Sequence, residues 1–90
     1  MSQQSSTYLH SAIISAVSNV KSLPITEVAV ESDLVYDLNM DSLELQEMVI
    51  ILEDDYSITI QDQDLSGVRT IGQLIERWHQ RRGILHSSVE

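Results

Sequence analysis

The sequence predicts an all-α fold, a small four-helix bundle in which three helices are long and one is short. Three segments repeat apolar residues at helical spacing, and the one short stretch with strand-like alternation has no second strand to pair with. With 90 residues and no cysteine, the chain must hold its core by packing rather than by disulfides or thiolate-bound metal. We therefore expect one domain, with residues 6–82 folded and residues 1–5 and 83–90 flexible.

The first helix is predicted from about Ser6 to Lys21. Apolar residues recur there at spacings of four, three and four, and these residues are Leu9, Ile13, Ala16 and Val20. Pro24 then prevents the helix from continuing, because it biases the residue before it toward an extended conformation. A long loop over residues 24–40 follows, and loops of this length in compact domains are often functional.

The second helix is predicted to begin at Asp41 and to run to about Asp55. The Asp41 carboxylate can accept hydrogen bonds from amides of the first turn, and Glu44 three residues later completes a capping-box pattern. One stripe of this helix is apolar and is expected to face the core; its residues are Leu45, Met48, Val49, Leu52 and Tyr56.

Two short elements are predicted to follow. Residues 58–60 alternate like a strand, and we interpret them as an extended connector that buries Ile58 and Ile60. Residues 62–66 can form one short helical turn that ends near Gly67.

The last helix is predicted to start after Thr70, which forms a capping-box pattern with Gln73. Its apolar residues recur at helical spacing and are Ile71, Leu74, Ile75 and Trp78. Arg81 and Arg82 suit the negative end of the helix dipole, and Gly83 is the expected end of the helix.

Negative charge is concentrated in the middle of the chain, which carries a net charge of −9. The stretch from Glu31 to Asp64 holds eleven acids and no Lys or Arg. Such a surface repels nucleic acid and favours protein partners with basic surfaces. The longest apolar run, residues 48–52, is far too short to cross a bilayer, and the polar N-terminus does not resemble a secretory signal. We expect a monomeric cytoplasmic protein without membrane contact.

A second stripe of the predicted second helix mixes aliphatic residues with carboxylates. Leu43, Glu47, Ile50 and Asp54 lie at spacings of four, three and four, offset from the apolar stripe. We interpret this stripe as a docking surface beside Ser42. The alternative is that Leu43 and Ile50 lie at the edge of the core.

The segment Leu38-Asn39-Met40-Asp41-Ser42-Leu43 resembles the Leu-Gly-x-Asp-Ser-Leu attachment motif of acyl carrier proteins. The likeness extends over about residues 23–80. It includes the stretch Asp33-Leu34-x-x-Asp37-Leu38, the stretch Leu52-Glu53-Asp54-Asp55-Tyr56-Ser57-Ile58, Ile60-x-Asp62 and Thr70-Ile71-Gly72. Asn39 replaces the family's glycine, and asparagine also tolerates a positive φ.

The resemblance implies that a separate phosphopantetheinyl transferase attaches 4′-phosphopantetheine from coenzyme A to Ser42, and that Asp41 and Leu43 flank this site. The thiol of the arm would carry acyl groups as thioesters for fatty-acid, polyketide or related specialised acyl biosynthesis. The expected partners are ketosynthases, reductases, acyltransferases or acyl ligases with basic surfaces, contacting Glu44, Glu47, Ile50 and Asp54. The acyl chain would lie between the second and third helices, and the residues expected to line this pocket are Leu52, Ile60, Leu65 and Ile71.

The sequence indicates no catalytic residues and no metal site. Asp41 cannot serve as a base for Ser42, because neighbouring residues on a helix do not face each other. No motif links Ser42 to a histidine. His10 and His79 are expected on helix surfaces, and His86 is expected in the tail. Residues 62–67 resemble the first half of an EF-hand loop, but Gln73 replaces its last acid. Two other interpretations stay open: a peptidyl or aminoacyl carrier, and a helical adaptor without a prosthetic group.

Overall fold

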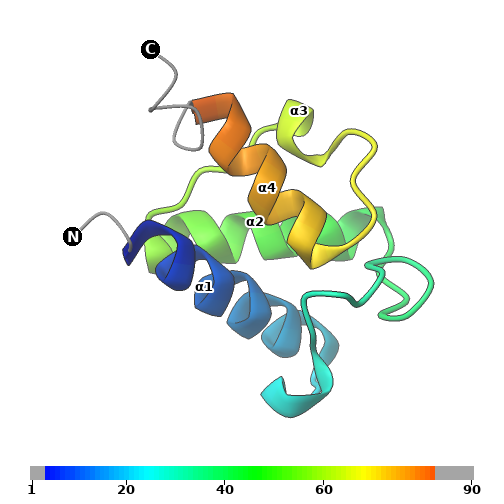
Figure 1. The fold of residues 1–90 in the computed structure, drawn as a ribbon. Coiled ribbons are helices and arrows are strands. Elements are labelled where there is room, and N and C mark those ends of the chain that lie inside the picture. Colours follow the sequence, from blue (N-terminus) through cyan, green and yellow to red (C-terminus); the bar gives the residue numbers. More distant parts are fainter. Residues whose placement is uncertain (1–3, 83–90) are drawn as a thin grey trace.

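The computed structural model describes residues 4–82. Within this range the elements are α1 (Gln4–Lys21), the 3₁₀ turn η1 (Ile25–Glu27), α2 (Ser42–Tyr56), α3 (Asp62–Leu65) and α4 (Ile71–Arg82) (Figure 1). The described range contains no strand, only an isolated bridge between Asp33 and Thr70. The predicted all-α fold with three long helices and one short helix is therefore confirmed. The expected helix end at Gly83 and the prediction for His86 lie outside the described residues.

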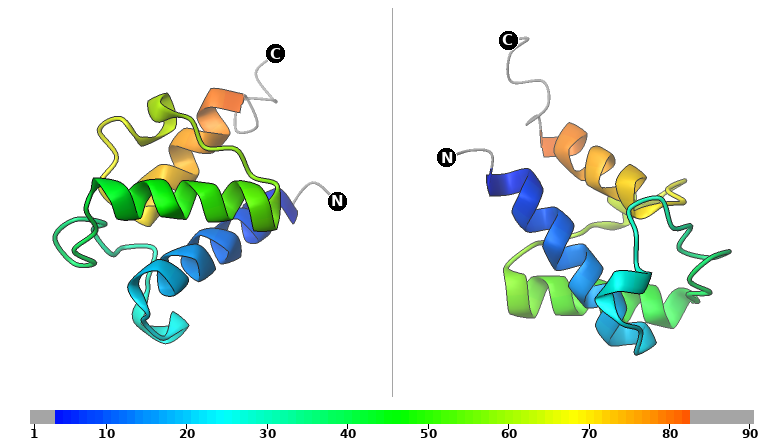
Figure 2. Two further views of the ribbon diagram at one scale, coloured as in Figure 1. Left: turned by 180° about the vertical axis from the view of Figure 1, so that it is seen from behind. Right: turned by 60° about the horizontal axis from the view of Figure 1, so that its bottom comes forward.

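The two helices that flank α1 are α2 and α4, and α3 packs against α4 (Figures 1 and 2). The face of α1 that carries Leu9, Ile13, Ala16 and Val17 is fully buried between them. Met48 and Leu52 supply the buried face of α2, and Ile71 and Leu74 that of α4. The helical spacing of apolar residues thus correctly predicted which face of α1, α2 and α4 is buried. The connector after α2 also follows the prediction, because Ile58 and Ile60 are buried and Thr59 is exposed.

The loop between α1 and α2 is held in place by buried side chains and by backbone hydrogen bonds. Val28, Leu34, Leu38 and Met40 are buried in the core. The Leu34 amide donates to the Arg69 carbonyl at 2.7 Å, and the Gly72 amide donates to the Val30 carbonyl at 2.9 Å. The loop is therefore fixed against the start of α4.

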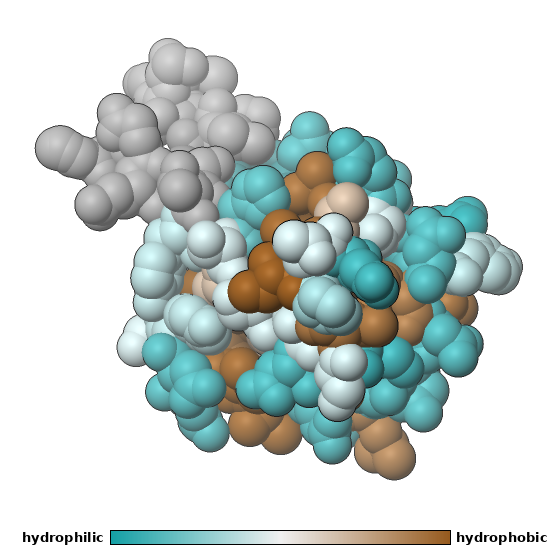
Figure 3. Space-filling view, turned by 90° about the horizontal axis from the view of Figure 1, so that it is seen from below, coloured by the Kyte–Doolittle hydropathy of each residue, from teal (hydrophilic) through white to brown (hydrophobic). Residues whose placement is uncertain are grey.

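Asp33 organises the tip of this loop. Its carboxylate accepts hydrogen bonds from the Tyr36 and Val35 amides, both at 2.9 Å, and pairs with Arg69 at 3.1 Å. The hydrogen bond from Tyr36 is the main reason that the pKa of Asp33 lies below its usual value; desolvation opposes this shift, and the Val35 amide and Arg69 support it. Val35 and Tyr36 themselves are exposed. The face seen from below also shows apolar residues, interrupted by hydrophilic ones (Figure 3).

The sequence predicts only that Arg81 and Arg82 interact favourably with the dipole of α4. In the structure the two arginines also form ion pairs. Both bind Asp64 of α3, with Arg81 Nε at 2.8 Å and Arg82 Nη1 at 3.0 Å from its Oδ1 atom. Asp64 is completely buried. Burial raises the pKa of Asp64, but the hydrogen bonds from Arg82, the Gln61 amide and Arg81 and the charge of Arg82 outweigh it and hold the pKa below its usual value. The carboxylate that resembled an EF-hand ligand is thus a structural anion.

His79 differs from the prediction, because it is buried and only 3% exposed rather than on a helix surface. It lies eight residues after Ile71, on the same side of α4, so the fold draws it into the interior. Its ring packs edge-on against Trp78, with 5.4 Å between the centroids. Burial lowers the pKa of His79, and the nearby charge of Arg82 lowers it further.

We predict that the free energy of unfolding falls as the pH is lowered from about 7 to 5. Unfolding returns His79 to its ordinary pKa of 6.5, so below that pH the unfolded state takes up protons more readily than the folded state. In chemical denaturation at a series of pH values, His79→Leu should flatten this slope. His10→Gln removes an exposed imidazole of α1 and should keep the slope of the wild type. Equal slopes in the wild type and in His79→Leu would contradict the prediction.

Candidate functional site

The first turn of α2 is held by a complete capping box. The Asp41 Oδ1 atom accepts a hydrogen bond from the Glu44 amide at 2.8 Å, and Glu44 Oε1 accepts one from the Asp41 amide at 3.2 Å. Asn39 precedes this box with φ of 55°, in the left-handed region that the sequence led us to expect. Ser42 is the first residue of the helix, and it is exposed. The local sequence therefore fixes where the Ser42 hydroxyl projects.

Lys21, at the C-terminal end of α1, completes this first turn. Its Nζ atom donates to the Asn39 carbonyl at 3.0 Å and lies 2.9 Å and 3.0 Å from the two carboxylate oxygens of Glu44. One cation thus ties the residue before the capping box to the residue that closes it. Sequence reasoning missed this contact because 23 residues separate Lys21 from Glu44. The sequence did offer one indication of this contact, because Lys21 is the only Lys or Arg before Arg69.

Glu44, which the sequence predicts as part of the docking surface, has partners within the chain. Its carboxylate binds Lys21 and the Asp41 amide, and its side chain is only 28% exposed. Glu44 therefore supports the start of α2, and its contact with a partner stays a prediction.

Leu43, Glu47, Ile50 and Asp54 are all exposed, and we call them the α2 face. Leu43 is 71% exposed and Ile50 is 56% exposed, so the alternative that these two lie at the edge of the core is wrong. Viewed from behind, α2 lies across the front of the molecule (Figure 2, left). The helix therefore presents two large aliphatic side chains to solvent among carboxylates, a pattern typical of interaction surfaces.

A cavity of about 380 Å³ opens beside Ser42, between α2 and the segment that carries α3. Its walls are mostly aliphatic, and its lining residues are Ser42, Leu45, Gln46, Val49, Ile50, Ile60, Asp62 and Leu65. Ile60 and Leu65 are two of the residues expected in an acyl pocket. The other two, Leu52 and Ile71, do not line this cavity, because both are fully buried in the core. The remaining lining residues were not predicted for the pocket, and they are Ser42, Leu45, Gln46, Val49, Ile50 and Asp62.

The residues present suit an ester-linked phosphate at Ser42. The hydroxyl is exposed and makes no hydrogen bond to another described residue, and α2 is long enough, at 15 residues, for its free amides and dipole to favour an anion at this end. Among the described residues, no group of three or more acids or histidines could hold a metal ion. No helix in residues 4–82 has the length and apolarity that crossing a bilayer requires.

We predict that Lys21→Met lowers the free energy of unfolding by about 1 kcal/mol, because the partly buried ion pair and the hydrogen bond to Asn39 are lost. Glu44→Gln keeps an oxygen for the Asp41 amide but removes the charge. In a double-mutant cycle measured by chemical denaturation, the two substitutions should be coupled by about 0.5–1 kcal/mol. Arg69→Met, which breaks an ion pair whose arginine is 62% exposed, should cost less. Additive effects of Lys21→Met and Glu44→Gln would contradict the prediction, because they would mean that the ion pair between the two residues adds no stability.

Comparison with known proteins identifies the family of this chain. A family model described as the phosphopantetheine attachment site matches residues 11–78. An acyl carrier protein of Rhodococcus erythropolis is 37% identical over 59 residues, covering 66% of this chain and 65% of that protein. The meromycolate extension acyl carrier protein of Mycolicibacterium smegmatis is also 37% identical over 59 residues, covering 66% of this chain and 60% of that protein. An acyl carrier protein of Saccharopolyspora erythraea is 39% identical over 54 residues, covering 60% of this chain and 57% of that protein.

The chain thus spans a little under two thirds of the length of these relatives. The family match itself covers more than half of the chain, and it includes the whole of α2 with Ser42 at its start. On this basis the chain belongs to the phosphopantetheine-attachment family of acyl carrier proteins.

Proposed function

We propose that this chain carries acyl groups as thioesters on a 4′-phosphopantetheine arm attached to Ser42, in fatty-acid, polyketide or related acyl biosynthesis. The observation that carries the proposal is the exposed hydroxyl at the start of α2, beside the aliphatic cavity and within the family match. The chain has no cysteine, so a thioester carrier of this sequence must receive its thiol from the prosthetic group. The protein itself performs no catalysis in this proposal.

The residues around Ser42 have separate roles in the proposal. Asp41 caps α2 and flanks the attachment site, where its carboxylate assists the transferase. Leu43, exposed beside Ser42, offers an apolar contact to enzymes that approach the arm. Ile60 and Leu65 line the place for the acyl chain, together with Leu45 and Val49 of α2. Leu52 and Ile71 support this site from within the core.

The proposed partners are a phosphopantetheinyl transferase and acyl-processing enzymes, among them ketosynthases, reductases, acyltransferases or acyl ligases. They dock on the α2 face through basic residues, because Glu47 and Asp54 flank the exposed Ile50. Two of the compared relatives are named simply acyl carrier proteins and one is named for meromycolate extension, which favours acyl over peptidyl cargo. We also propose that the chain acts as a monomer in the cytoplasm.

Incubation with coenzyme A and a broad-specificity phosphopantetheinyl transferase should raise the intact mass by about 340 Da, the mass of the arm. Ser42→Ala should abolish the increase, because the accepting oxygen is gone. Ser66→Ala, which removes another exposed serine, should keep it. Modification of Ser42→Ala would show that the site is elsewhere, and an unmodified wild type would favour a helical adaptor without a prosthetic group.

Charge reversal at Glu47 and Asp54 together should lower kcat/KM of the transferase for this carrier roughly tenfold at low salt, because electrostatic steering is lost. The dependence of kcat/KM on salt concentration should also flatten. Charge reversal at Glu27 and Glu76, two exposed acids away from α2, is the matched control and should change kcat/KM much less. Equal effects of the two pairs would mean that only net charge matters and that the α2 face has no special role.

A further inference from the structure

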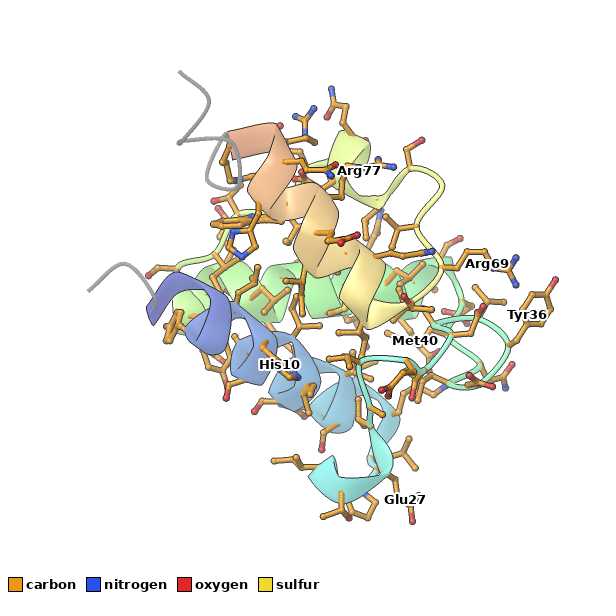
Figure 4. The ribbon with its side chains drawn as sticks, in the orientation of Figure 1. His10, Glu27, Tyr36, Met40, Arg69 and Arg77 are labelled. Carbon is orange, nitrogen blue, oxygen red and sulfur yellow. The ribbon has the colours of Figure 1, made fainter. Side chains whose placement is uncertain are left out.

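The segment from Thr59 to Ser66, which carries α3, is fastened to α4 by side chains of that helix. Trp78 Nε1 and Arg82 Nη2 both donate to the Thr59 carbonyl, at 3.0 Å and 2.9 Å. Arg77 Nη1 donates to the Gln63 carbonyl at 3.0 Å and to the Ser66 carbonyl at 2.9 Å, and so ties α4 to the backbone of α3. Figure 4 shows Arg77 on the side of α4 that faces α3. One helix thus holds both ends of the segment.

Asp64 is the centre of this attachment. Its carboxylate is completely buried, and it receives hydrogen bonds from Arg81, Arg82 and the Gln61 amide. Arg81 also donates to the Gln61 side chain at 3.0 Å. A buried carboxylate that loses its cations is strongly destabilising. Moving α3 away from α4 would therefore expose or unpair this charge, which makes the position of α3 costly to change.

The opposite side of the same segment forms a wall of the cavity beside Ser42. Ile60, Asp62 and Leu65 lie on this wall, and the facing wall belongs to α2. No Cα atom of α3 lies within 8 Å of a Cα atom of α2, whereas α3 packs closely on α4. The width of the cavity is therefore set by α4, a helix that contributes no residue to its lining.

The size of the cavity then limits what it can hold. A volume of about 380 Å³ accommodates roughly a dozen groups of the size of a methylene or a water molecule, at about 30 Å³ each. A wall that moved freely would let longer chains enter. A wall fixed by ion pairs to the buried Asp64 would not.

We propose that Arg77, Arg81 and Arg82, through Asp64 and the carbonyls of residues 59–66, act as positioning residues that fix the cavity wall and limit the part of an acyl chain that the cavity holds to about twelve carbons. The proposal rests on the function proposed above. It assigns the length limit to contacts on the far side of the wall rather than to the lining residues alone.

The test loads Ser42 with saturated acyl groups of 4 to 18 carbons, using acyl-coenzyme A and the transferase, and records two properties of each loaded protein. The thermal midpoint of unfolding should rise by several degrees with chain length and stop rising near twelve carbons, because further carbons stay in water. The methyl NMR signals of Ile60 and Leu65 should shift over the same range and then stay constant. Neither measurement depends on a partner enzyme.

Arg82→Met and Arg77→Met keep much of the aliphatic length of arginine but lose the bonds to the wall, and each should move the plateau to chains at least two carbons longer. Arg69→Met removes one positive charge and an ion pair outside the segment, and it should keep the plateau of the wild type. A thermal midpoint that keeps rising to 18 carbons in the wild type would overturn the inference. So would an unchanged plateau in both variants, and if Arg82→Met does not fold by circular dichroism, Arg77→Met decides. Failure to load Ser42 at all would instead overturn the function proposed above, and this inference with it.

Discussion

The surface that α2 presents depends on how firmly one side of this helix is bound to α1. The two helices are tied at both ends. Lys21, at the end of α1, binds Asn39 and Glu44 at the start of α2, and Tyr8, near the beginning of α1, donates to the Tyr56 carbonyl at the end of α2 at 2.9 Å. The rings of Tyr8 and Tyr56 also pack edge to face, 6.1 Å apart. Between these ties Met48 and Leu52 are fully buried. The first turn of α2 therefore has a defined position, although its outer side is open to solvent.

The molecule can be described as two helix pairs that meet along α1. One pair is α1 with α2, joined by apolar packing and the ties at their ends. The other is α3 with α4, joined by arginines, a tryptophan and one buried carboxylate. The cavity lies between α2 of one pair and α3 of the other, two helices that do not pack directly on each other. The cavity is open to solvent, and each of its walls packs against another helix on its far side.

Local patterns predicted the helices, the inward faces and the capping boxes at the starts of α2 and α4, because each depends on residues within one or two turns. The motif around Ser42 was recognisable for the same reason. Patterns of this kind do not record which distant side chain reaches a carbonyl or a carboxylate. The contacts of Lys21 with Glu44 and of Arg82 with Asp64 were therefore missed. Leu52 and Ile71 were placed in the pocket because an apolar side chain suits a cavity lining as well as a core.

His79 illustrates the same limit of local patterns, because it was predicted to be exposed and is buried. A polar residue on an amphipathic helix is usually exposed, and for this reason His79 was predicted to lie on the surface. Its position in the helix, on the side of Ile71, indicated burial instead. The packing of α4 on α1 and α3 buries that side whatever residue occupies it. The hydrogen bonds of Arg81 and Arg82 likewise follow from the position of α3, which a four-residue helix does not reveal in its own sequence.

The hydrogen bond between Trp78 and the Thr59 carbonyl gives this protein a built-in optical label. The chain contains a single tryptophan, so its indole emission arises at one place, next to the backbone of the residue that precedes Ile60. The Arg82 guanidinium lies over the same ring, 4.3 Å from its centroid. Fluorescence of the unlabelled protein therefore samples the connector and its arginine together, at a location that is separate from Ser42.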